Sequence, residues 1–365
     1  MMISFVIILL LIIITIIFLR QPKFGRLPAG ERLDRIKSSP NYKNGSFQNI
    51  SHTPNLAENA SYFKVFKEFF FDKKIRVQPA GIIPGVKTDL INLDLNKNIL
   101  VWFGHSSYFM QVDGKRILVD PVFSGHASPF SFSIKAFKGT NIYTPDDMPA
   151  IDLLIITHDH WDHLDYDTVK KLRPKVSKVI CGLGTGAHLE RWGYNKDIII
   201  EKDWNEKIAL RDNFTIFTIP ARHFSGRGLS RNKALWTSFV LKTPKRQIFI
   251  GGDSGYDKHF AETGNTFGTF DLAVIENGQY NESWKYIHLL PGEVLQAAKD
   301  LHAKRVLPVH SGKFPLALHA WDEPFKLITA NSKKENIDVI TPIIGEVVDL
   351  DNTQQVFSHW WENID

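Results

Sequence analysis

The hydrophobic pattern divides the chain into an apolar N-terminal run, a polar connection and a long β-rich body. Residues 3–19 (ISFVIILLLIIITIIFL) contain only two polar side chains, Ser4 and Thr15. A helix over this run would extend about 25 Å, close to the thickness of a thin bilayer core. We therefore predict four segments: a transmembrane anchor (1–19), a basic juxtamembrane segment and N-terminal extension (20–94), a catalytic domain (95–350) and a C-terminal tail (351–365).

A cleaved signal peptide is the alternative interpretation of the apolar run. No basic residue precedes the run and no small-x-small cleavage site follows it, which favours an uncleaved single-span anchor. Residues 20–37 carry six basic and two acidic side chains. The positive-inside rule then predicts a single-pass membrane protein with its catalytic domain on the cytoplasmic side. The same basic cluster could lie on anionic lipid headgroups.

A polar connection separates this segment from the body. Residues 38–60 are rich in Ser, Asn and Pro and indicate an extended linker. In residues 61–74, Phe63, Phe66 and Phe70 recur at helical spacing with lysines between them. We expect a helix there, either packed on the catalytic domain or lying in a membrane interface.

Short apolar strands dominate the pattern from residue 98 onward. Asp113-Gly114 between two of them is a strong hairpin signal. Many strands with helices interspersed predict an α/β fold with two sheets and helices outside. The predicted strands are 99–103, 108–112, 116–119, 153–157, 178–180, 214–219, 238–241, 247–250, 272–275 and 306–309, and the predicted helices are 167–172, 292–302 and 321–334.

Charge and cysteine content narrow the class of protein. The 44 Lys and Arg residues exceed the 39 Asp and Glu residues, for a net charge of +5. Most of that excess lies in residues 20–37, so the catalytic body is nearly neutral and we expect no nucleic-acid partner. The single cysteine, Cys181, excludes an intramolecular disulfide and a zinc site built from several thiolates.

A dense group of possible metal ligands follows the apolar strand at 153–157. The sequence His158-Asp159-His160-Trp161-Asp162-His163 has the pattern H-x-H-x-D-H. Two histidines at this spacing can point to one metal ion, and the following Asp and His can point to a second. Imidazole and carboxylate are ligands that zinc accepts at neutral pH.

Three later residues extend this group. His223, Asp253 and His310 each come just after a predicted strand, where loops place functional side chains on a rigid scaffold. Together the seven residues resemble the ligand set of the metallo-β-lactamase fold superfamily, and the resemblance spans about residues 95–350. It implies a four-layered αββα sandwich. It also implies that His158, His160 and His223 bind one zinc ion, that Asp162, His163 and His310 bind a second, and that Asp253 bridges both.

Two adjacent cations would supply the chemistry of a hydrolase. A water molecule shared by them becomes a hydroxide nucleophile near neutral pH, and the cations stabilise the developing oxyanion. The ligand set favours two Zn²⁺ ions, although similar sets also accept iron or manganese.

The surrounding segments narrow the type of hydrolase. Residues 120–124 (DPVFS), 182–194 (GLGTGAHLERWGY), 221–227 (ARHFSGR) and 322–325 (DEPF) are similar to those of the N-acyl-phosphatidylethanolamine-hydrolysing phospholipase D group. The resemblance implies cleavage of N-acyl phosphatidylethanolamine to an N-acylethanolamine and phosphatidic acid. The chain departs from the group at Ser311-Gly312-Lys313 and at Glu276-Asn277-Gly278, which leaves the headgroup and acyl preference open.

Four further residues are candidates for roles at the site. His105 could contact substrate or support a ligand, with a plain structural histidine as the alternative. The resemblance places His288 over the active site, where it could contact phosphate or protonate the leaving oxygen. Lys313 and Arg222 could bind phosphate, with a surface lysine and a structural ion pair as the respective alternatives. We therefore expect Asp253, His288 and His105 in catalysis, and His288, Lys313 and Arg222 in substrate binding.

The sequence as a whole predicts a membrane-anchored dizinc phosphodiesterase acting on membrane phospholipid, with the N-terminal helix as its membrane contact. A lactonase or other small-ester hydrolase of the same fold is the enzymatic alternative. A binding module with a vestigial site and a nuclease are weaker alternatives. A homodimer is compatible with the sequence.

Overall fold

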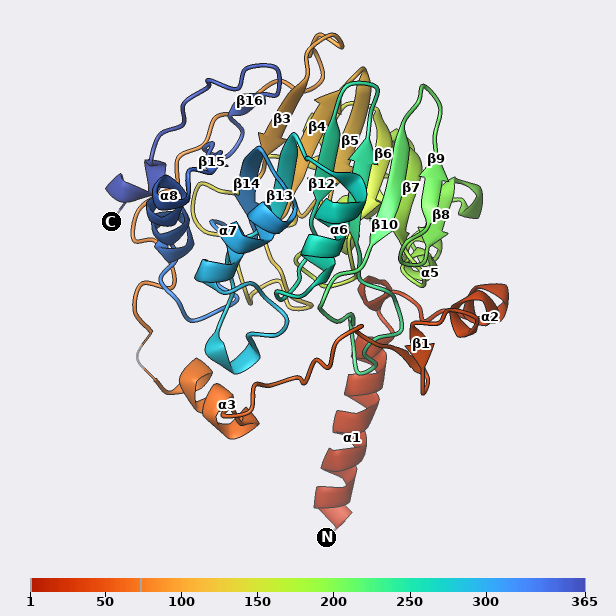
Figure 1. Ribbon diagram of the computed structural model, residues 1–365. Coiled ribbons are helices and arrows are strands. Elements are labelled where there is room, and N and C mark those ends of the chain that lie inside the picture. Colours follow the sequence, from red (N-terminus) through yellow and green to blue (C-terminus); the bar gives the residue numbers. More distant parts are fainter. Residues whose placement is uncertain (1, 73, 365) are drawn as a thin grey trace.

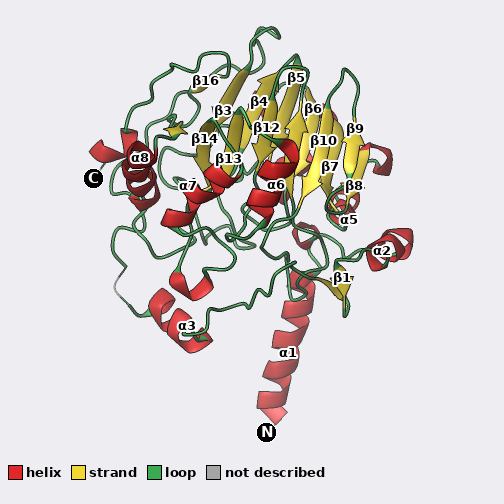
Figure 2. Cartoon of the chain, viewed as in Figure 1, coloured by secondary structure: helices red, strands yellow, loops and turns green. Residues whose placement is uncertain are grey.

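Two mixed β-sheets form the centre of the protein, as seen in the computed structural model, which describes residues 2–72 and 74–364 (Figures 1 and 2). The first sheet has seven strands in the order β16-β3-β4-β5-β6-β7-β8. Its strands are β3 (Ile99–Trp102), β4 (Tyr108–Val112), β5 (Lys115–Val119), β6 (Ile151–Ile156), β7 (Val176–Gly182), β8 (Ile199–Lys202) and β16 (Val347–Asp349). Pairing is antiparallel from β16 to β5 and parallel from β5 to β8.

The second sheet repeats this mixture of parallel and antiparallel pairing. Its seven strands have the order β15-β14-β13-β12-β11-β10-β9, with parallel pairs from β15 to β12 and antiparallel pairs from β12 to β9. Its strands are β9 (Lys207–Ala209), β10 (Thr215–Ile219), β11 (Ser238–Lys242), β12 (Gln247–Ile250), β13 (Leu272–Glu276), β14 (Arg305–Val309) and β15 (Asp338–Val339). A separate pair consists of β1 (Tyr42–Lys43) and β2 (Ser46–Phe47).

Three apolar layers hold the sheets and helices together. The central layer combines side chains of both sheets, such as Trp102 and Phe239. The outer face of the first sheet packs with α4 (Tyr166–Leu172) and α5 (Gly186–Arg191). The outer face of the second sheet packs with α6 (His259–Phe267), α7 (Pro291–Asp300) and α8 (Glu323–Glu335). This arrangement confirms the predicted α/β fold.

Local sequence explains two features that position the site. Asp113 and Gly114 both have positive φ and join β4 to β5 in a two-residue turn, as predicted for a type I′ hairpin. The strand β6 lies between two parallel neighbours and is buried along most of its length, which suits its continuous apolar sequence. Its carboxyl end therefore delivers the following loop to one edge of the sheet.

The N-terminal helix corrects the predicted membrane topology. The helix α1 (Met2–Leu19) projects from the body in Figure 1, and its side chains from Ser4 onward are mostly exposed. A helix of 18 residues extends about 27 Å, which is short of the roughly 30 Å of a bilayer core. Within residues 2–72 and 74–364, no helix combines the length and apolar character needed to cross a membrane. The predicted single-pass anchor and the membrane location derived from it are wrong.

The basic segment after α1 is docked on the catalytic domain. It contains α2 (Gly30–Lys37), and its arginines pair with acidic side chains of the body. Arg32 binds Glu190 and Glu201 at 2.5 and 2.6 Å, and Arg26 binds Glu190 at 3.1 Å. Three of the six basic side chains in residues 20–37, those of Arg26, Arg32 and Arg35, are therefore paired with carboxylates of the body.

The predicted helix in residues 61–74 forms as α3 (Tyr62–Phe70). Its N-terminus is capped by the Ser61 hydroxyl, which accepts a hydrogen bond from the Lys64 amide. Phe69 stacks on Trp284 at a ring distance of 5.9 Å, whereas Phe63 and Phe70 are exposed. The helix therefore lies beside the catalytic domain with an aromatic face turned to solvent.

Candidate metal centre

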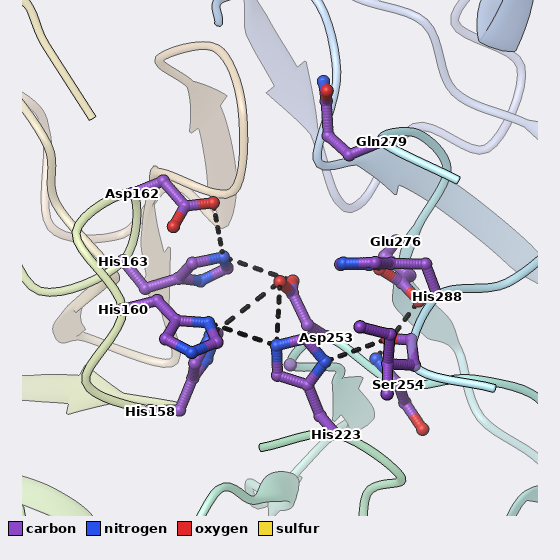
Figure 3. A network of polar contacts seen from close by, with 12 residues as sticks. His158, His160, Asp162, His163, His223, Asp253, Ser254, Glu276, Gln279 and His288 are labelled. Atoms are coloured by element: carbon purple, nitrogen blue, oxygen red, sulfur yellow. Dashed lines mark hydrogen bonds and ion pairs between the residues drawn. The ribbon is translucent and has the colours of Figure 1, made fainter. Parts of the chain in front are cut away.

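The predicted ligands lie in loops at the carboxyl ends of four strands. His158, His160, Asp162 and His163 follow β6, and this loop turns back through a hydrogen bond of 2.8 Å from the Leu164 amide to the His160 carbonyl. The other three follow β10, β12 and β14, and are His223, Asp253 and His310. The two sheets bring these loops to one edge, so residues far apart in the sequence converge (Figure 3).

The first group of converging atoms consists of three imidazoles and a carboxylate. His160 Nδ1 lies 2.9 Å from His158 Nε2 and 3.2 Å from His223 Nε2. Asp253 Oδ2 lies 3.8 Å from His158 Nε2 and 3.7 Å from His223 Nε2. Three ring nitrogens facing one another in a buried pocket leave space and donor atoms for a cation of the zinc type.

A second group lies on the other side of the same carboxylate. Asp253 Oδ1 is 3.2 Å from both His163 Nε2 and His310 Nδ1. Asp162 Oδ2 is 3.4 Å from His163 Nε2. The two oxygens of Asp253 thus face different groups, as a carboxylate bridging two metal ions would (Figure 3). The residues present fit a dinuclear centre.

Burial sets the protonation state of most of these imidazoles. Loss of solvent lowers the pKa of His158, His223 and His310 well below its usual value, and lowers that of His160 to about 4. Neutral imidazole is the form that binds a metal. Burial likewise opposes charge on His163, but Asp253 and Asp162 outweigh it and raise its pKa.

Groups behind the ligands fix their orientation. His163 Nδ1 donates to Asp120 Oδ2 at 2.8 Å, and the same carboxylate accepts hydrogen bonds from the amide and hydroxyl of Thr157. His223 Nδ1 donates to the Ile287 carbonyl at 2.9 Å. Such partners hold the ring so that its other nitrogen faces the metal. This role of Asp120 was not predicted from the sequence, although a carboxylate directly after a strand was the available signal.

His105 contacts the predicted ligands without lining the cavity. It is fully buried, and its Nε2 lies 2.8 Å from Asp162 Oδ2. Its ring packs on that of His310 at 4.2 Å. The residue touches two predicted ligands and is not among the cavity-lining residues, so its geometry favours the supporting role over substrate contact.

His288 and Glu276 form a pair at the opposite side of the centre. His288 Nδ1 lies 2.7 Å from Glu276 Oε2, and Glu276 Oε1 accepts hydrogen bonds from the amides of Ser254 and Leu289. His288 lines the cavity and stacks on His310 at a ring distance of 5.1 Å. In the sequence Glu276 stands out only as a departure from the related group, and its contact with His288 could not be predicted from sequence.

The structure does not bring the two expected phosphate-binding residues to the cavity. The Lys313 ammonium is buried and donates to the carbonyls of Phe103 and Val122, and burial lowers its pKa to about 7. The Arg222 guanidinium bonds to Thr53, His52 and Tyr256. Both cations are engaged in holding loops together, because backbone carbonyls there need donors.

A cavity of about 300 Å³ opens directly onto the converging ligands. Aromatic and aliphatic side chains surround its polar base, and a single arginine reaches its rim. The lining residues are Asn55, Leu56, His160, Asp162, His223, Phe224, Arg231, Asp253, Gln279, Trp284, Ile287, His288, His310 and Leu316. The ligands are therefore accessible to a substrate.

Comparisons with known proteins agree with this geometry. Residues 115–311 match the β-lactamase superfamily domain. An uncharacterized protein of Mycobacterium tuberculosis is 35% identical over 333 residues, covering 89% of this chain and 88% of that protein. N-acyl-phosphatidylethanolamine-hydrolyzing phospholipase D 1 of Caenorhabditis elegans is 31% identical over 273 residues, covering 67% of this chain and 74% of the worm protein.

A solved structure shares the fold. The metallo hydrolase Igni18 of Ignicoccus hospitalis aligns with a TM-score of 0.54 at 22% identity, over 69% of this chain and 97% of that chain. The chain belongs to the metallo-β-lactamase superfamily. It is a metal-dependent hydrolase whose relatives include the worm phospholipase D, and its converging histidine and aspartate side chains fit a dinuclear metal centre. The predicted family and enzyme class are confirmed.

Proposed function

We propose that this protein is a dizinc phosphodiesterase that cleaves N-acyl phosphatidylethanolamine into an N-acylethanolamine and phosphatidic acid. The observation that carries the proposal is the placement of Asp253 between two ligand groups at the base of an open cavity. The similarity to the worm phospholipase D supports a phosphodiester as the substrate.

The chain's residues divide into two metal-binding sets. His158, His160 and His223 would hold one ion, a second set of Asp162, His163 and His310 would hold the other, and Asp253 would contact both. When bound, the two cations supply an acidified water as nucleophile and positive charge for the developing oxyanion. Histidine and carboxylate ligands favour zinc.

His288 is placed to handle the leaving group. Its Nδ1 is held by Glu276, which leaves Nε2 for the cavity. In this reaction the oxygen of water bonds to phosphorus and the bond from phosphorus to the ethanolamine oxygen breaks. For this step His288 would be doubly protonated, having gained the proton that the attacking water loses, with Nδ1–H held by Glu276. Transfer of the Nε2 proton to the leaving oxygen would complete release of the N-acylethanolamine and leave a neutral imidazole.

The rim of the cavity favours a lipid substrate over a small soluble one. Trp284 lines the cavity and stacks on Phe69 of α3. On the outer face of this helix, Phe63 and Phe70 are 78% and 71% exposed. Contiguous exposed aromatic side chains are typical of sites that meet another apolar surface. A substrate whose acyl chains lie in a lipid aggregate would place such a surface there.

One assay separates this proposal from the lactonase alternative. The purified, metal-loaded protein is given N-acyl phosphatidylethanolamine and, in parallel, a set of lactones. Release of N-acylethanolamine is expected, with loss of at least about 100-fold in rate for Asp253→Asn at unchanged folding. Hydrolysis of lactones alone would contradict the proposal.

A further inference from the structure

We propose that Arg231, with Asn55 beside it, forms an anion-binding subsite at the rim of the cavity that binds the charged phosphate group of the substrate. This inference rests on the proposed function, because it names the residue that would recognise the anionic part of the same substrate. Nothing in the sequence motif of the ligands requires an arginine at this place.

One aromatic ring lies between the Arg231 guanidinium and the candidate metal centre. It sits over the Phe224 ring at 3.9 Å from the ring centre. The Phe224 ring in turn contacts those of His160 and His223 at 4.3 and 4.7 Å. Stacking on an aromatic face holds a guanidinium in place while leaving its edge free for hydrogen bonding.

The donors of Arg231 are largely unused. Among the residues that the structure describes, its side chain makes one hydrogen bond, from Nη1 to Asn55 Oδ1 at 3.5 Å, the weak end of the range. Within the described residues it forms no ion pair with a carboxylate. Its neighbours differ: Arg222 bonds to three oxygen atoms, and Arg227 bonds to the carbonyls of Lys23, Asp159 and Leu164.

The backbone that carries Arg231 is held in place. The Asn232 amide donates to the Ser225 carbonyl at 2.9 Å, and the Phe47 amide donates to the Asn232 carbonyl at 2.9 Å. Ser225 Oγ donates to the Ala234 carbonyl at 2.6 Å. The loop between β10 and β11 therefore presents Arg231 at a fixed point of the rim.

The chemistry of the guanidinium selects for an anion. A phosphodiester carries one negative charge shared by two non-bridging oxygens, which match the fork of a guanidinium. A lactone or neutral ester offers no such charge. Arg231 would therefore contribute to the binding of phosphodiesters and leave neutral substrates nearly unaffected.

The test compares Arg231→Gln and Arg231→Lys with wild type on N-acyl phosphatidylethanolamine and on a neutral aryl ester. Arg231→Gln is expected to lower kcat/KM for the phosphodiester about 10- to 100-fold, mostly through KM, and to change that for the ester less than about threefold. Arg231→Lys is expected to restore part of the loss. Arg211→Gln, which removes an exposed arginine that does not line the cavity, is the matched control.

Inorganic phosphate provides a readout that does not depend on the lipid reaction. Its inhibition constant, measured with whichever substrate the wild type hydrolyses, is expected to rise about tenfold in Arg231→Gln at unchanged metal content and melting temperature. Equal losses on the phosphodiester and the ester, or an unchanged phosphate inhibition constant, would overturn the subsite. Absence of phosphodiester turnover by wild type, with the phosphate effect intact, would instead refute the proposed function.

Discussion

Replacing Glu276 by glutamine tests whether its contact with His288 serves the reaction. The carboxylate is buried, with its Oε1 bonded to two backbone amides and its Oε2 facing His288 Nδ1. Burial raises the pKa of Glu276, but cations in the adjacent centre would favour the charged form. We therefore expect an ionised glutamate that accepts a hydrogen bond from Nδ1–H and stabilises the doubly protonated imidazole, whose Nε2–H faces the cavity.

The amide cannot reproduce this arrangement. If the glutamine oxygen keeps the hydrogen bonds from both backbone amides, the glutamine NH₂ group faces His288 Nδ1. The Nδ1 atom must then accept a hydrogen bond instead of donating one. The charge-assisted hydrogen bond that is lost contributes roughly 1.5–3 kcal/mol, which corresponds to a factor of about 10–150 in rate. We expect kcat to fall by this whole factor for N-acyl phosphatidylethanolamine, because N-acylethanolamine is a poor leaving group that needs a proton. For a p-nitrophenyl phosphodiester, whose leaving oxygen needs no proton, kcat should fall only slightly.

The assay is therefore kcat on both phosphodiesters for Glu276→Gln, His288→Ala and the double variant. Metal content is measured as a control, since a change there would act on both substrates. If Glu276 acts through His288, the double variant should be no slower than His288→Ala. Equal slowing of both substrates, or additive losses in the double variant, would refute this role.

Three other predictions follow from the contacts around the centre. Asp120→Asn weakens the hold on His163 and should lower metal affinity about 10- to 100-fold in chelator competition, and unchanged affinity would contradict this. The pKa of the Lys313 ammonium is depressed to about 7, so the unfolded state binds more protons than the native state above that pH. The difference in unfolding free energy between wild type and Lys313→Met should therefore rise with pH from about 7, by up to about 1.4 kcal/mol per pH unit. Denaturant titrations that show the same difference at every pH would refute this prediction. Phe63→Ser with Phe70→Ser should raise KM for substrate in vesicles and leave a short-chain monomeric substrate unaffected; equal effects on both would count against the lipid-facing role of α3.

Much of the fold could be predicted because its strands are apolar and short. The predicted strands at 108–112 and 247–250 coincide with β4 and β12. Strand β8 (Ile199–Lys202) and strand β9 (Lys207–Ala209) were missed, because they are partly exposed edge elements with charged residues in them. Alternation and burial are the signals that sequence reasoning uses, and both are weak at a sheet edge.

The metal ligands could be predicted for a different reason. His158, His160, Asp162 and His163 are neighbours in sequence, and the remaining three follow strands whose ends meet at one edge. Contacts that depend on side-chain direction could not be predicted. Lys313 and Arg222 are close in sequence to ligands, yet their cations turn toward backbone carbonyls. Arg231 is eight residues after His223, and only the folded loop shows that it reaches the rim.

The apolar N-terminal run shows the limit of composition. Its residues are as hydrophobic as those of a membrane span, and the helix still ends at Leu19. The chain then continues into a segment that Arg32 fastens to the body. The helix therefore coincides with the apolar run identified at 3–19, and composition did not show that a helix of this length falls short of a membrane span.

The most direct test of the central claim is a metal titration followed by lipid hydrolysis. Metal-free protein is titrated with zinc while release of N-acylethanolamine from N-acyl phosphatidylethanolamine is measured. The dinuclear phosphodiesterase proposed here predicts activity that rises until two equivalents of zinc are bound per chain and then stays constant. Protein that binds two equivalents and releases no N-acylethanolamine, or that reaches full activity without bound metal, would contradict it.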